Sequence, residues 1–241
     1  MQSAETARTN FENLSRNSYP GRGIVLGLSS TGEEMLQVYW IMGRSANSRN
    51  RVFVVHGEEM RTRAFDESKL EDPSLIIYWP MRLVGRAHVV TNGDQTDTIA
   101  DALRAGGDFE QALRTREFEP DAPNFTPRIS GVVDLDDSCA YRLSILKSGD
   151  PEGDSCLRQY FYYEQAARGF GHGITTYRGD GNPLPSFAGE PLLLPLCDGA
   201  EATAKFYWDA LNADNRVSLA VKAIPLDGRP SKIVVVNSNV K

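Results

Sequence analysis

The sequence predicts an α+β fold, and three features of the chain support this prediction. Short apolar and β-branched segments dominate the first ninety residues. Helical periodicity replaces them in the middle of the chain, and strand-like segments then return. One more helical segment precedes two final strands. Since the strands occur in runs, we expect layered sheets and helices, and not a parallel sheet of alternating strands and helices.

The N-terminal half begins with a polar segment and continues as strands. Residues 1–18 are polar and mixed in charge, which favours a helical or frayed extension. The domain itself starts near Tyr19, and residues 30–33 fit a tight turn between its first two strands. Apolar and β-branched runs predict strands at 24–28, 35–42, 51–56, 74–78 and 81–90.

Two helical segments follow, and strands return after them. In residues 97–105 and 108–114 the apolar residues recur on one face, and Asp108 is a suitable N-cap for the second segment. Prolines between residues 119 and 127 end the helical pattern. The remainder predicts strands at 128–135, 141–147 and 157–164, a loop at 169–195, a helix at 200–211, and strands at 216–224 and 232–238.

The composition fits one globular domain. The chain has 241 residues, of which 41% are hydrophobic and 24% charged, as in ordinary soluble proteins. It shows no internal repeat, low-complexity tract or clear linker. We therefore expect an extension at residues 1–18 followed by a single domain at 19–241.

The charge balance limits the ligands that the protein can bind. A net charge of -6 argues against a general binder of nucleic acids or membrane surfaces. Arginines nevertheless outnumber lysines by 20 to 6. The planar guanidinium suits phosphate and carboxylate groups, so a small anionic ligand stays open, although lineage bias explains the excess equally well.

Cysteines and histidines give no sign of a disulfide framework or a metal site. The three cysteines show no CxxC spacing, and the three histidines are scattered. The first 17 residues lack the apolar stretch of a secretory signal, and no apolar run is long enough to span a membrane. We expect a cytoplasmic protein without a bound metal.

The densest polar cluster lies between two predicted strands. It contains Arg44, Ser45, Arg49, Asn50 and Arg51. Guanidinium forks and hydroxyl donors at this density could surround a phosphate monoester. A solvated hairpin loop would have the same composition, and the residue order of a P-loop is absent. Both interpretations stay open.

A second polar segment joins a predicted strand to the first predicted helix. Asn92 and Gly93 suit a turn with positive φ, and Asp94 or Thr96 can cap the helix. Asn92 and Gln95 each carry a donor and an acceptor, so they could bind the edge of an amide or a heterocycle. Helix capping alone explains the segment equally well.

Later segments combine glycine or proline with polar side chains. Residues 119–129 hold three prolines together with Asp121 and Arg128, and this rigid loop could position groups for binding or proton transfer. His172 lies among three glycines, which would let a ligand approach the backbone. Glu190 lies between a glycine and a proline. A purely structural loop would also explain each of these segments.

Familiar catalytic signatures are absent. The sequence contains no GxSxG elbow, no HExxH pair, no dinucleotide-binding glycine pattern and no kinase set. Residue 2 is Gln, so the chain as written exposes no Ser, Thr or Cys nucleophile at its start.

Four segments occur in an order that is specific as a set. They are Tyr-Pro-Gly-Arg-Gly at 19–23, Gly-Arg-Ser and Arg-Asn-Arg within 43–51, Thr-Asn-Gly-Asp-Gln-Thr at 91–96, and Pro-Asp through Thr-Pro-Arg-Ile at 120–129. This set resembles the archaeal-type inosine monophosphate (IMP) cyclohydrolase family, including its bacterial members. The resemblance runs from Tyr19 to the C-terminus and is densest before residue 131.

The resemblance implies a fold and an activity. The fold is a four-layer αββα sandwich of the N-terminal nucleophile hydrolase type. The activity is closure of 5-formamidoimidazole-4-carboxamide ribotide to IMP with loss of water, the last step of purine synthesis. It implies a purine ribotide as the ligand and no cofactor, and it leaves a homo-oligomer open. The extension before Tyr19 departs from the short archaeal form, which weakens any role for a free α-amino group near that residue.

The implied chemistry suggests roles for the polar residues. The carboxamide nitrogen must lose a proton, the developing oxyanion must be stabilised, and both reacting groups must be held in the reactive conformer. We assign catalysis to Tyr19, Arg22, Arg44, Asp121 and Glu190. We assign substrate binding to Ser45, Arg49, Asn50, Arg51, Asn92, Gln95, Arg128 and His172.

Two other functions stay open. An amidohydrolase on the same fold would act on another C–N bond and would need a nucleophile exposed by processing. A non-catalytic module would bind a purine nucleotide through the arginine cluster.

Overall fold

A computed structural model of the protein describes residues 2–70, 73 and 76–240, and these fold into two antiparallel sheets. Within this part of the chain, the first sheet has six strands in the order β11-β10-β1-β2-β12-β13. Strands from both ends of the chain therefore meet at its centre, where β2 pairs with β12. The strands are β1 (Gly23–Leu28), β2 (Glu34–Met42), β10 (Phe170–Thr175), β11 (Leu192–Pro195), β12 (Arg216–Pro225) and β13 (Lys232–Asn237).

The second sheet is built mostly from neighbours in sequence. Over the described residues it has seven strands in the order β3-β4-β5-β6-β7-β8-β9, so each strand pairs with the next along the chain. Its strands are β3 (Val52–His56), β4 (Glu59–Arg63), β5 (Met81–Val84), β6 (Ala87–Thr91), β7 (Arg128–Asp134), β8 (Tyr141–Ser148) and β9 (Cys156–Tyr163).

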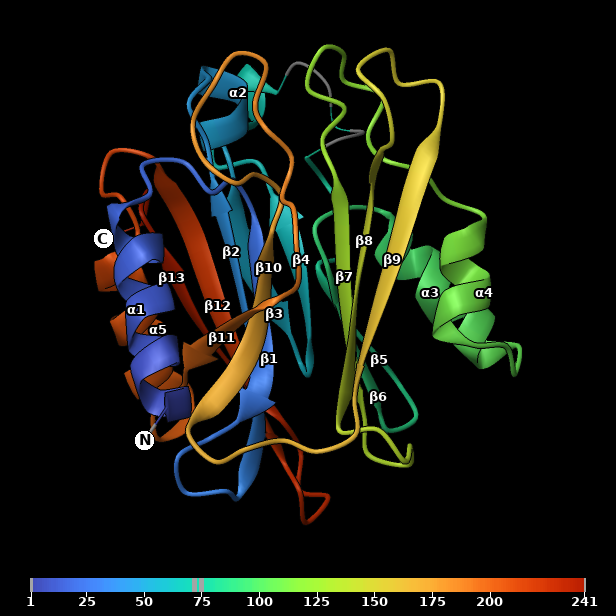
Figure 1. Cartoon of the computed structure of the whole chain (residues 1–241), viewed down its shortest axis with the longest axis vertical. Helices are drawn as coiled ribbons and strands as arrows, with labels where there is room; N and C mark the ends of the chain where they lie inside the picture. The colour runs from blue at the N-terminus through green and yellow to red at the C-terminus, as the bar shows by residue number, and fades with distance from the viewer. Residues whose placement is uncertain (1, 71–72, 74–75, 241) are drawn as a thin grey trace.

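Helices lie on the outer faces of the two sheets. Figure 1 shows α1 and α5 against the first sheet and α3 and α4 against the second, so that the sheets face each other in the middle. The short α2 lies in the connection from β2 to β3. The helices are α1 (Gln2–Arg16), α2 (Ala46–Arg49), α3 (Gln95–Arg104), α4 (Phe109–Arg114) and α5 (Gly199–Ala210), with a 3₁₀ turn at Glu67–Lys69.

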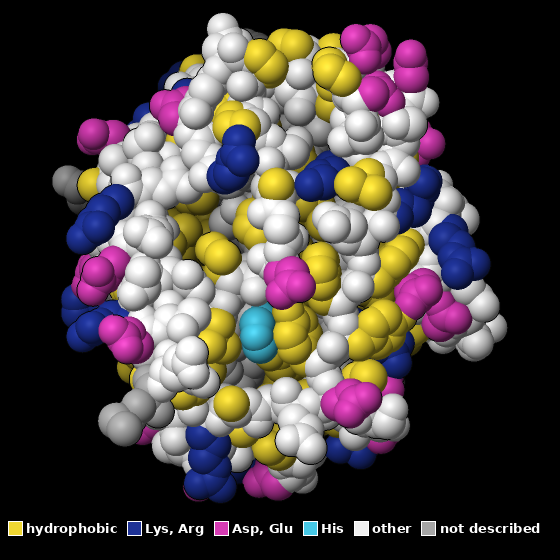
Figure 2. All heavy atoms as spheres, viewed as in Figure 1, with side chains coloured by type: hydrophobic (Ala, Val, Ile, Leu, Met, Phe, Trp, Pro, Cys, Tyr) yellow, Lys and Arg dark blue, Asp and Glu magenta, His cyan; other side chains and the backbone are white. Residues whose placement is uncertain are grey.

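Alternation along the strands fills three apolar layers. In β2, Tyr39 packs between the sheets, while the next residue, Trp40, packs beneath the helices of the first sheet. Val89 of β6 packs beneath α3 and α4. Figure 2 shows hydrophobic side chains gathered around a histidine in the centre of one face, where Figure 1 places β9 and β10. The predicted α+β class is confirmed.

The polar N-terminal segment is helical over Gln2–Arg16 and packs on the domain. Leu14 is buried in the layer beneath the helices of the first sheet. The ring of Phe11 stacks on Phe206 of α5, with 4.1 Å between the ring centroids. None of the helices in the described ranges has the length and apolar character that crossing a membrane requires.

Two strand predictions need correction, and one strand was not predicted. Residues 76–78 form no strand: only the Tyr78 carbonyl accepts a backbone hydrogen bond from Thr62, while the Tyr78 nitrogen donates to the Thr62 hydroxyl. Residues 74–75 of that prediction lie outside the described residues. The predicted strand 81–90 is two strands, because Gly85 adopts φ 59° in a turn between them. The polar β4 (Glu59–Arg63) was not predicted, since only alternate side chains in it are buried.

The predicted loop at 169–195 contains two strands, β10 and β11. Its glycines serve close packing as well as turns. A Cβ on Gly171 would lie 2.5 Å from the carbonyl oxygen of Leu26 in β1, so only glycine lets the two strands approach. The sequence alone predicts a loop here, because the residues that require these glycines to be small lie far away in the sequence.

Helix caps follow the predictions in one case and depart from them in another. The Asp108 carboxylate accepts a hydrogen bond from the backbone nitrogen of Gln111 at 2.8 Å, as expected for an N-cap. Asp94 also occupies an N-cap position, but its side chain makes no capping bond. Its carboxylate instead pairs with Arg116 and Arg128.

Candidate functional site

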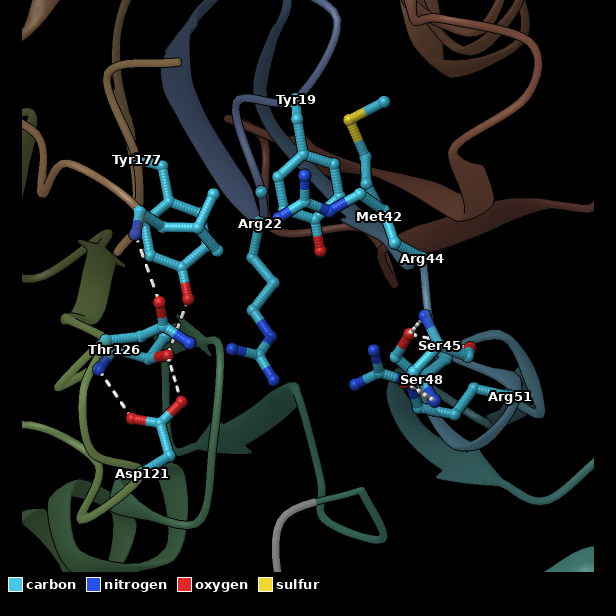
Figure 3. A pocket seen from close by; sticks show the side chains of 13 residues that line it. Tyr19, Arg22, Met42, Arg44, Ser45, Ser48, Arg51, Asp121, Thr126 and Tyr177 are labelled. Carbon is cyan, nitrogen blue, oxygen red and sulfur yellow. Dashed lines mark hydrogen bonds between the residues drawn. The ribbon is translucent and has the colours of Figure 1, made fainter. Parts of the chain in front are cut away.

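A polar pocket of about 360 Å³ opens at the end of the sandwich that carries α2 (Figures 1 and 3). It collects residues from four separate parts of the chain: the entry to β1, the β2–β3 connection, the proline-rich loop before β7 and the segment after β10. Its lining includes six residues predicted from the sequence, namely Tyr19, Arg22, Arg44, Ser45, Arg51 and Asp121. The further lining residues are Gly21, Met42, Ser48, Asn124, Thr126, Tyr177 and Leu184.

The entry to β1 is shaped by Gly21. This residue has φ 74°, and a Cβ on it would lie 2.2 Å from the Thr176 hydroxyl oxygen. Only glycine combines this backbone conformation with so close an approach to the end of β10. The tight entry places Tyr19 over Tyr177, with stacked rings whose centroids are 6.0 Å apart. It also turns the Arg22 side chain into the space between the sheets (Figure 3).

Two arginines, the largely buried Arg22 and the fully buried Arg51, dominate the floor of the pocket. Figure 3 shows their guanidinium groups pointing toward each other from opposite sides. Arg22 Nη1 lies 3.4 Å from Glu119 Oε2, and Arg51 Nε donates to the Ser48 carbonyl at 2.8 Å. Arg22 Nε and Arg51 Nη1 are buried and have no hydrogen-bond partner among the described residues. Buried donors without partners are costly, so this floor is suited to an anionic ligand.

The pKa shifts of Arg22 and Arg51 also favour an anionic ligand. Burial and then the like charge of Arg22 lower the pKa of the Arg51 guanidinium. Burial alone would also lower the pKa of Arg22, but its attraction to Glu119 and to nearby tyrosine hydroxyls raises that pKa overall. The positive charge that faces the pocket is thus only partly neutralised by the protein, and an anion would stabilise both groups.

Glu119 is a buried carboxyl group beside this pair. It is 2% exposed, and burial raises the pKa of its carboxyl group, while Arg22 and Arg128 oppose that shift. A carboxyl group with a raised pKa can accept and return a proton nearer to neutral pH than an ordinary glutamate can.

A hydrogen-bonded chain lines the other wall. The Asp121 carboxylate accepts from the Thr126 backbone nitrogen at 2.6 Å and from the Thr126 hydroxyl at 2.5 Å. The same hydroxyl lies 2.6 Å from the Tyr177 hydroxyl, and burial raises the pKa of Tyr177 to about 12. Tyr177 therefore stays protonated at neutral pH and can donate a hydrogen bond.

The arginine-rich segment 43–51 crosses from the first sheet to the second and is not a hairpin loop. Ser45 and Ser48 form a reciprocal capping box that folds the segment into α2. The Arg44 guanidinium lies 4.3 Å from the centroid of the Tyr19 ring and pairs with Asp180 at the pocket rim. The crossover thus places Arg44 and Arg51 at two different depths of one pocket.

The two other predicted residues of this segment lie outside the pocket lining. Arg49 points away and donates to the backbone carbonyl of Asp214. The Asn50 side chain exchanges two hydrogen bonds with the backbone of Asp66, at 2.8 and 2.7 Å, and so ties the crossover to the segment after β4.

Asn92, Gln95 and Arg128 form a separate buried network behind the proline-rich loop. Asn92 donates to the Pro127 carbonyl at 2.9 Å and accepts from the Ile129 backbone nitrogen at 2.8 Å. Gln95 donates to the Asn92 side chain and accepts from Arg128, both within 2.9 Å. The network fixes the loop that carries Glu119 and Asp121, and none of its three members lines the pocket.

His172 and Glu190 lie in another part of the molecule. His172 Nδ1 is 2.6 Å from the Tyr141 hydroxyl, and its ring stacks on Tyr163 with 3.9 Å between centroids. Burial lowers the pKa of His172 to about 4. Glu190 is exposed and raises the pKa of Tyr163 through its charge, after the larger effect of burial. The structure does not bring these residues to the pocket lining.

Some residues of the site were missed in the sequence. Glu119, Thr126 and Asn124 lie in the proline-rich loop that the sequence marked as rigid, where Asp121 was chosen instead. Tyr177 follows the glycine-rich segment around His172. Composition pointed to the two segments, but only the structure shows that Asn124, Thr126 and Tyr177 line the pocket, while Glu119 lies against Arg22 outside the lining.

The donor set favours anion binding over metal binding. Across the residues that the structure describes, no group of three or more His, Cys, Asp or Glu side chains could hold a metal ion. The pocket lining combines three arginines, three hydroxyl-bearing side chains of Ser or Thr and two tyrosines. These groups can bind phosphate or a developing oxyanion and can orient a polar ring.

Comparison with known proteins identifies the family. The model of the IMP cyclohydrolase-like protein family matches residues 19–228. The chain is 33% identical over 124 residues to an IMP cyclohydrolase of Methanococcus maripaludis strain S2 and 34% identical over 120 residues to one of Methanopyrus kandleri. These matches cover 50% and 48% of this chain and 60% and 59% of the relatives, so the chain spans less than two thirds of the curated proteins it matches. The family match extends over most of the chain, and the protein belongs to the IMP cyclohydrolase-like family.

Proposed function

We propose that the protein is an IMP cyclohydrolase that closes 5-formamidoimidazole-4-carboxamide ribotide to IMP with loss of water. The family match and the printed names of the relatives support this activity. One observation in the structure carries it further: Arg22 and Arg51 line the pocket, and each has a buried nitrogen without a hydrogen-bond partner among the described residues. A phosphorylated, ring-closing substrate offers both a phosphate and a developing oxyanion for such donors.

Ring closure requires orientation, charge stabilisation and proton transfer. The carboxamide nitrogen attacks the formyl carbon and gives up one proton, and the formamido nitrogen gives up a second. The formyl oxygen takes up both protons and leaves as water. Both reacting groups are on one molecule, so the pocket accelerates the reaction mainly by holding the reactive conformer. In our proposal Arg22 and Arg51 stabilise negative charge on the oxygen, and Glu119 accepts the proton.

The outer part of the pocket is proposed to hold the ribotide. Arg44, at the rim, and the hydroxyls of Ser45 and Ser48 would bind the 5′-phosphate. Tyr19 presents an aromatic face beside them. Because the Thr126 hydroxyl donates to Asp121, the Tyr177 hydroxyl donates to Thr126, and its oxygen would accept a hydrogen bond from the ribotide. Binding energy from the phosphate would thereby hold the reacting groups over the buried arginines.

We also propose the finer assignments that the family suggests. The two facing sheets with outer helices are those of an N-terminal nucleophile hydrolase type of sandwich, with residues 19–241 as one domain and 1–18 as an extension. The activity would take place in the cytoplasm with no cofactor, on a small purine ribotide and not on nucleic acid.

A direct assay tests the proposal. Purified protein is incubated with 5-formamidoimidazole-4-carboxamide ribotide, and IMP formation is followed by absorbance. We expect turnover well above the uncatalysed rate, and an Arg44→Ala variant should lose at least about tenfold in kcat/KM because it removes a charged contact. The exposed Arg104, at the end of α3, provides a matched control as Arg104→Gln.

Other outcomes identify other functions. Tight binding of IMP with no turnover of the formamido compound would contradict the enzyme and favour a nucleotide-binding module. Hydrolysis of a different C–N bond would favour an amidohydrolase on the same fold.

A further inference from the structure

A second polar pocket lies on the outer side of the proline-rich loop. It has a volume of about 400 Å³ and shares no lining residue with the candidate active site. It lies between the C-terminal end of α4 and β9, which Figure 1 shows beside each other. Four arginines line it, namely Arg114, Arg116, Arg128 and Arg158, and we call it the arginine pocket.

The arginine pocket carries more positive than negative charge. Arg116 and Arg128 share one carboxylate, that of Asp94, at 2.5 and 2.6 Å. The other two guanidinium groups have carboxylates farther away: Glu110 lies 3.8 Å from Arg114, and Glu117, which also lines the pocket, lies 4.0 Å from Arg158. Four guanidinium groups therefore have a single carboxylate within ordinary hydrogen-bonding distance in the described part of the chain.

The donors of the pocket are held in place by the backbone. Arg158 Nη2 donates to the Arg116 carbonyl at 2.8 Å, which links β9 to the end of α4. Arg158 Nε is buried and has no hydrogen-bond partner among the described residues. Arg128 is only 8% exposed at its side chain, so part of the positive charge is fixed on the pocket floor.

We infer that the arginine pocket is a second anion-binding site, which takes a phosphate group. Arginine forks present paired N–H donors at the spacing of phosphate oxygens, and several forks that converge on one concavity favour a multiply charged anion over chloride. The pocket is larger than one phosphate, and the half-buried ring of Phe118 lies on its wall. Inorganic phosphate and the phosphate of a nucleotide share this chemistry.

Calorimetric titration tests the site, with inorganic phosphate and adenosine 5′-monophosphate as the two probes. In the wild-type protein we expect a class of phosphate site at the arginine pocket. Its affinity should be the same in the Arg44→Ala variant, which changes only the active-site pocket. The substitution Arg158→Gln should weaken this class at least about tenfold, because it removes a charge-assisted contact. For the class of site that Arg158→Gln weakens, tighter binding of the nucleotide than of phosphate would identify a nucleotide as the ligand; equal or weaker binding would identify free phosphate.

Two controls keep the test decisive. Arg104→Gln removes the same charge from the exposed end of α3 and should leave phosphate binding unchanged. Crystals of the wild-type protein soaked in selenate show the position of the anion without any variant, and we expect its anomalous peak between Arg116, Arg128 and Arg158. A peak absent from the arginine pocket, or binding that Arg158→Gln and Arg104→Gln weaken equally, would overturn the inference. Neither measurement depends on cyclohydrolase activity, so the inference stands or falls independently of the proposed function.

Discussion

Two buried polar clusters lie side by side near one end of the sandwich, and they differ in how their hydrogen bonds are used. Around Arg22 and Arg51, two buried N–H donors have no protein partner in the described part of the chain. Around Asn92 and Gln95, the amide groups bind backbone groups and each other at 2.8 to 3.2 Å. The sequence predicts a catalytic role for Arg22 and substrate binding for Arg51, Asn92 and Gln95. Little of either cluster is exposed to solvent.

The difference distinguishes a cluster that can bind a ligand from a cluster that stabilises the fold. Buried polar groups are almost always satisfied, so donors that remain free in a pocket indicate space for a ligand. A saturated network would have to lose internal hydrogen bonds before it could bind anything. The comparison therefore predicts different consequences for substitutions in the two clusters.

The largest effect is expected at Glu119, beside the free donors. Glu119→Gln should lower kcat/KM by about 10² to 10⁴-fold, the usual range for loss of a general base. Because the pKa of this carboxyl group is raised, wild-type activity should fall as the pH drops through that raised pKa and the carboxylate takes up a proton. The variant should lack this acid limb in a pH–rate profile. Glu152→Gln, at an exposed loop position, is the control, and an unchanged profile for Glu119→Gln would remove it as the base.

A smaller effect on binding is expected at Arg51. Arg51→Lys keeps the charge but loses the planar fork, and it should weaken IMP binding about tenfold in calorimetry. Arg49→Lys is a matched control, because Arg49 lies two residues earlier in the same crossover and binds the Asp214 carbonyl outside the pocket. Equal losses in the two variants would mean that the crossover as a whole, and not the buried donor, determines affinity.

In the saturated network the main effect is expected on stability. Asn92→Ala leaves the Pro127 carbonyl and the Ile129 backbone nitrogen without partners, which should cost about 2–4 kcal/mol of unfolding free energy in urea denaturation. Asn13→Ala, at an exposed position on α1, is the control. A variant of normal stability with a raised KM would instead place Asn92 in contact with the substrate.

An effect confined to the acid stability of the fold, with none expected on activity, is predicted far from both clusters, at His172. Partial burial lowers the pKa of this imidazole to about 4, from the ordinary histidine value of 6.5. The unfolded chain therefore binds an extra proton between these two values, so the unfolding free energy should fall as the pH drops from about 6.5 to 4. His172→Gln should flatten this part of the stability curve. A slope that is unchanged in the variant would assign the acid sensitivity to other groups, such as His88, whose pKa burial lowers to about 3.

Much of the secondary structure could be predicted from local pattern. The apolar and β-branched runs of β1, β2 and β12 and the one-sided apolar faces of α3 and α4 are visible in the sequence itself. Strands β10 and β11 could not be predicted. Gly171 and Gly173 are needed there because a side chain would collide with residues of β1, and that contact is not visible in the sequence. The polar β4 could not be predicted either. It belongs to the sheet because its backbone pairs with β3, and its sequence lacks the apolar run that indicates a strand.

The candidate site was predictable as a set of segments but less so as a set of residues. The segments around Arg22, Arg44 and Asp121 all reach the pocket. Within one segment, however, Arg51 turns inward and Arg49 outward, and the residue types alone do not distinguish them. Glu119 was passed over for Asp121 because burial, which raises its pKa, depends on residues from distant strands.

The sequence by itself determined the α+β class, most strands and helices, and the polar segments that line the pocket, because these follow from local periodicity and residue type. Only the tertiary structure decided which arginines keep free donors, which carboxyl group is buried beside them, and which amides are already saturated. Those properties depend on desolvation and on hydrogen-bond partners from other parts of the chain. They exist only once β1, the β2–β3 crossover and the proline-rich loop meet at one end of the two sheets.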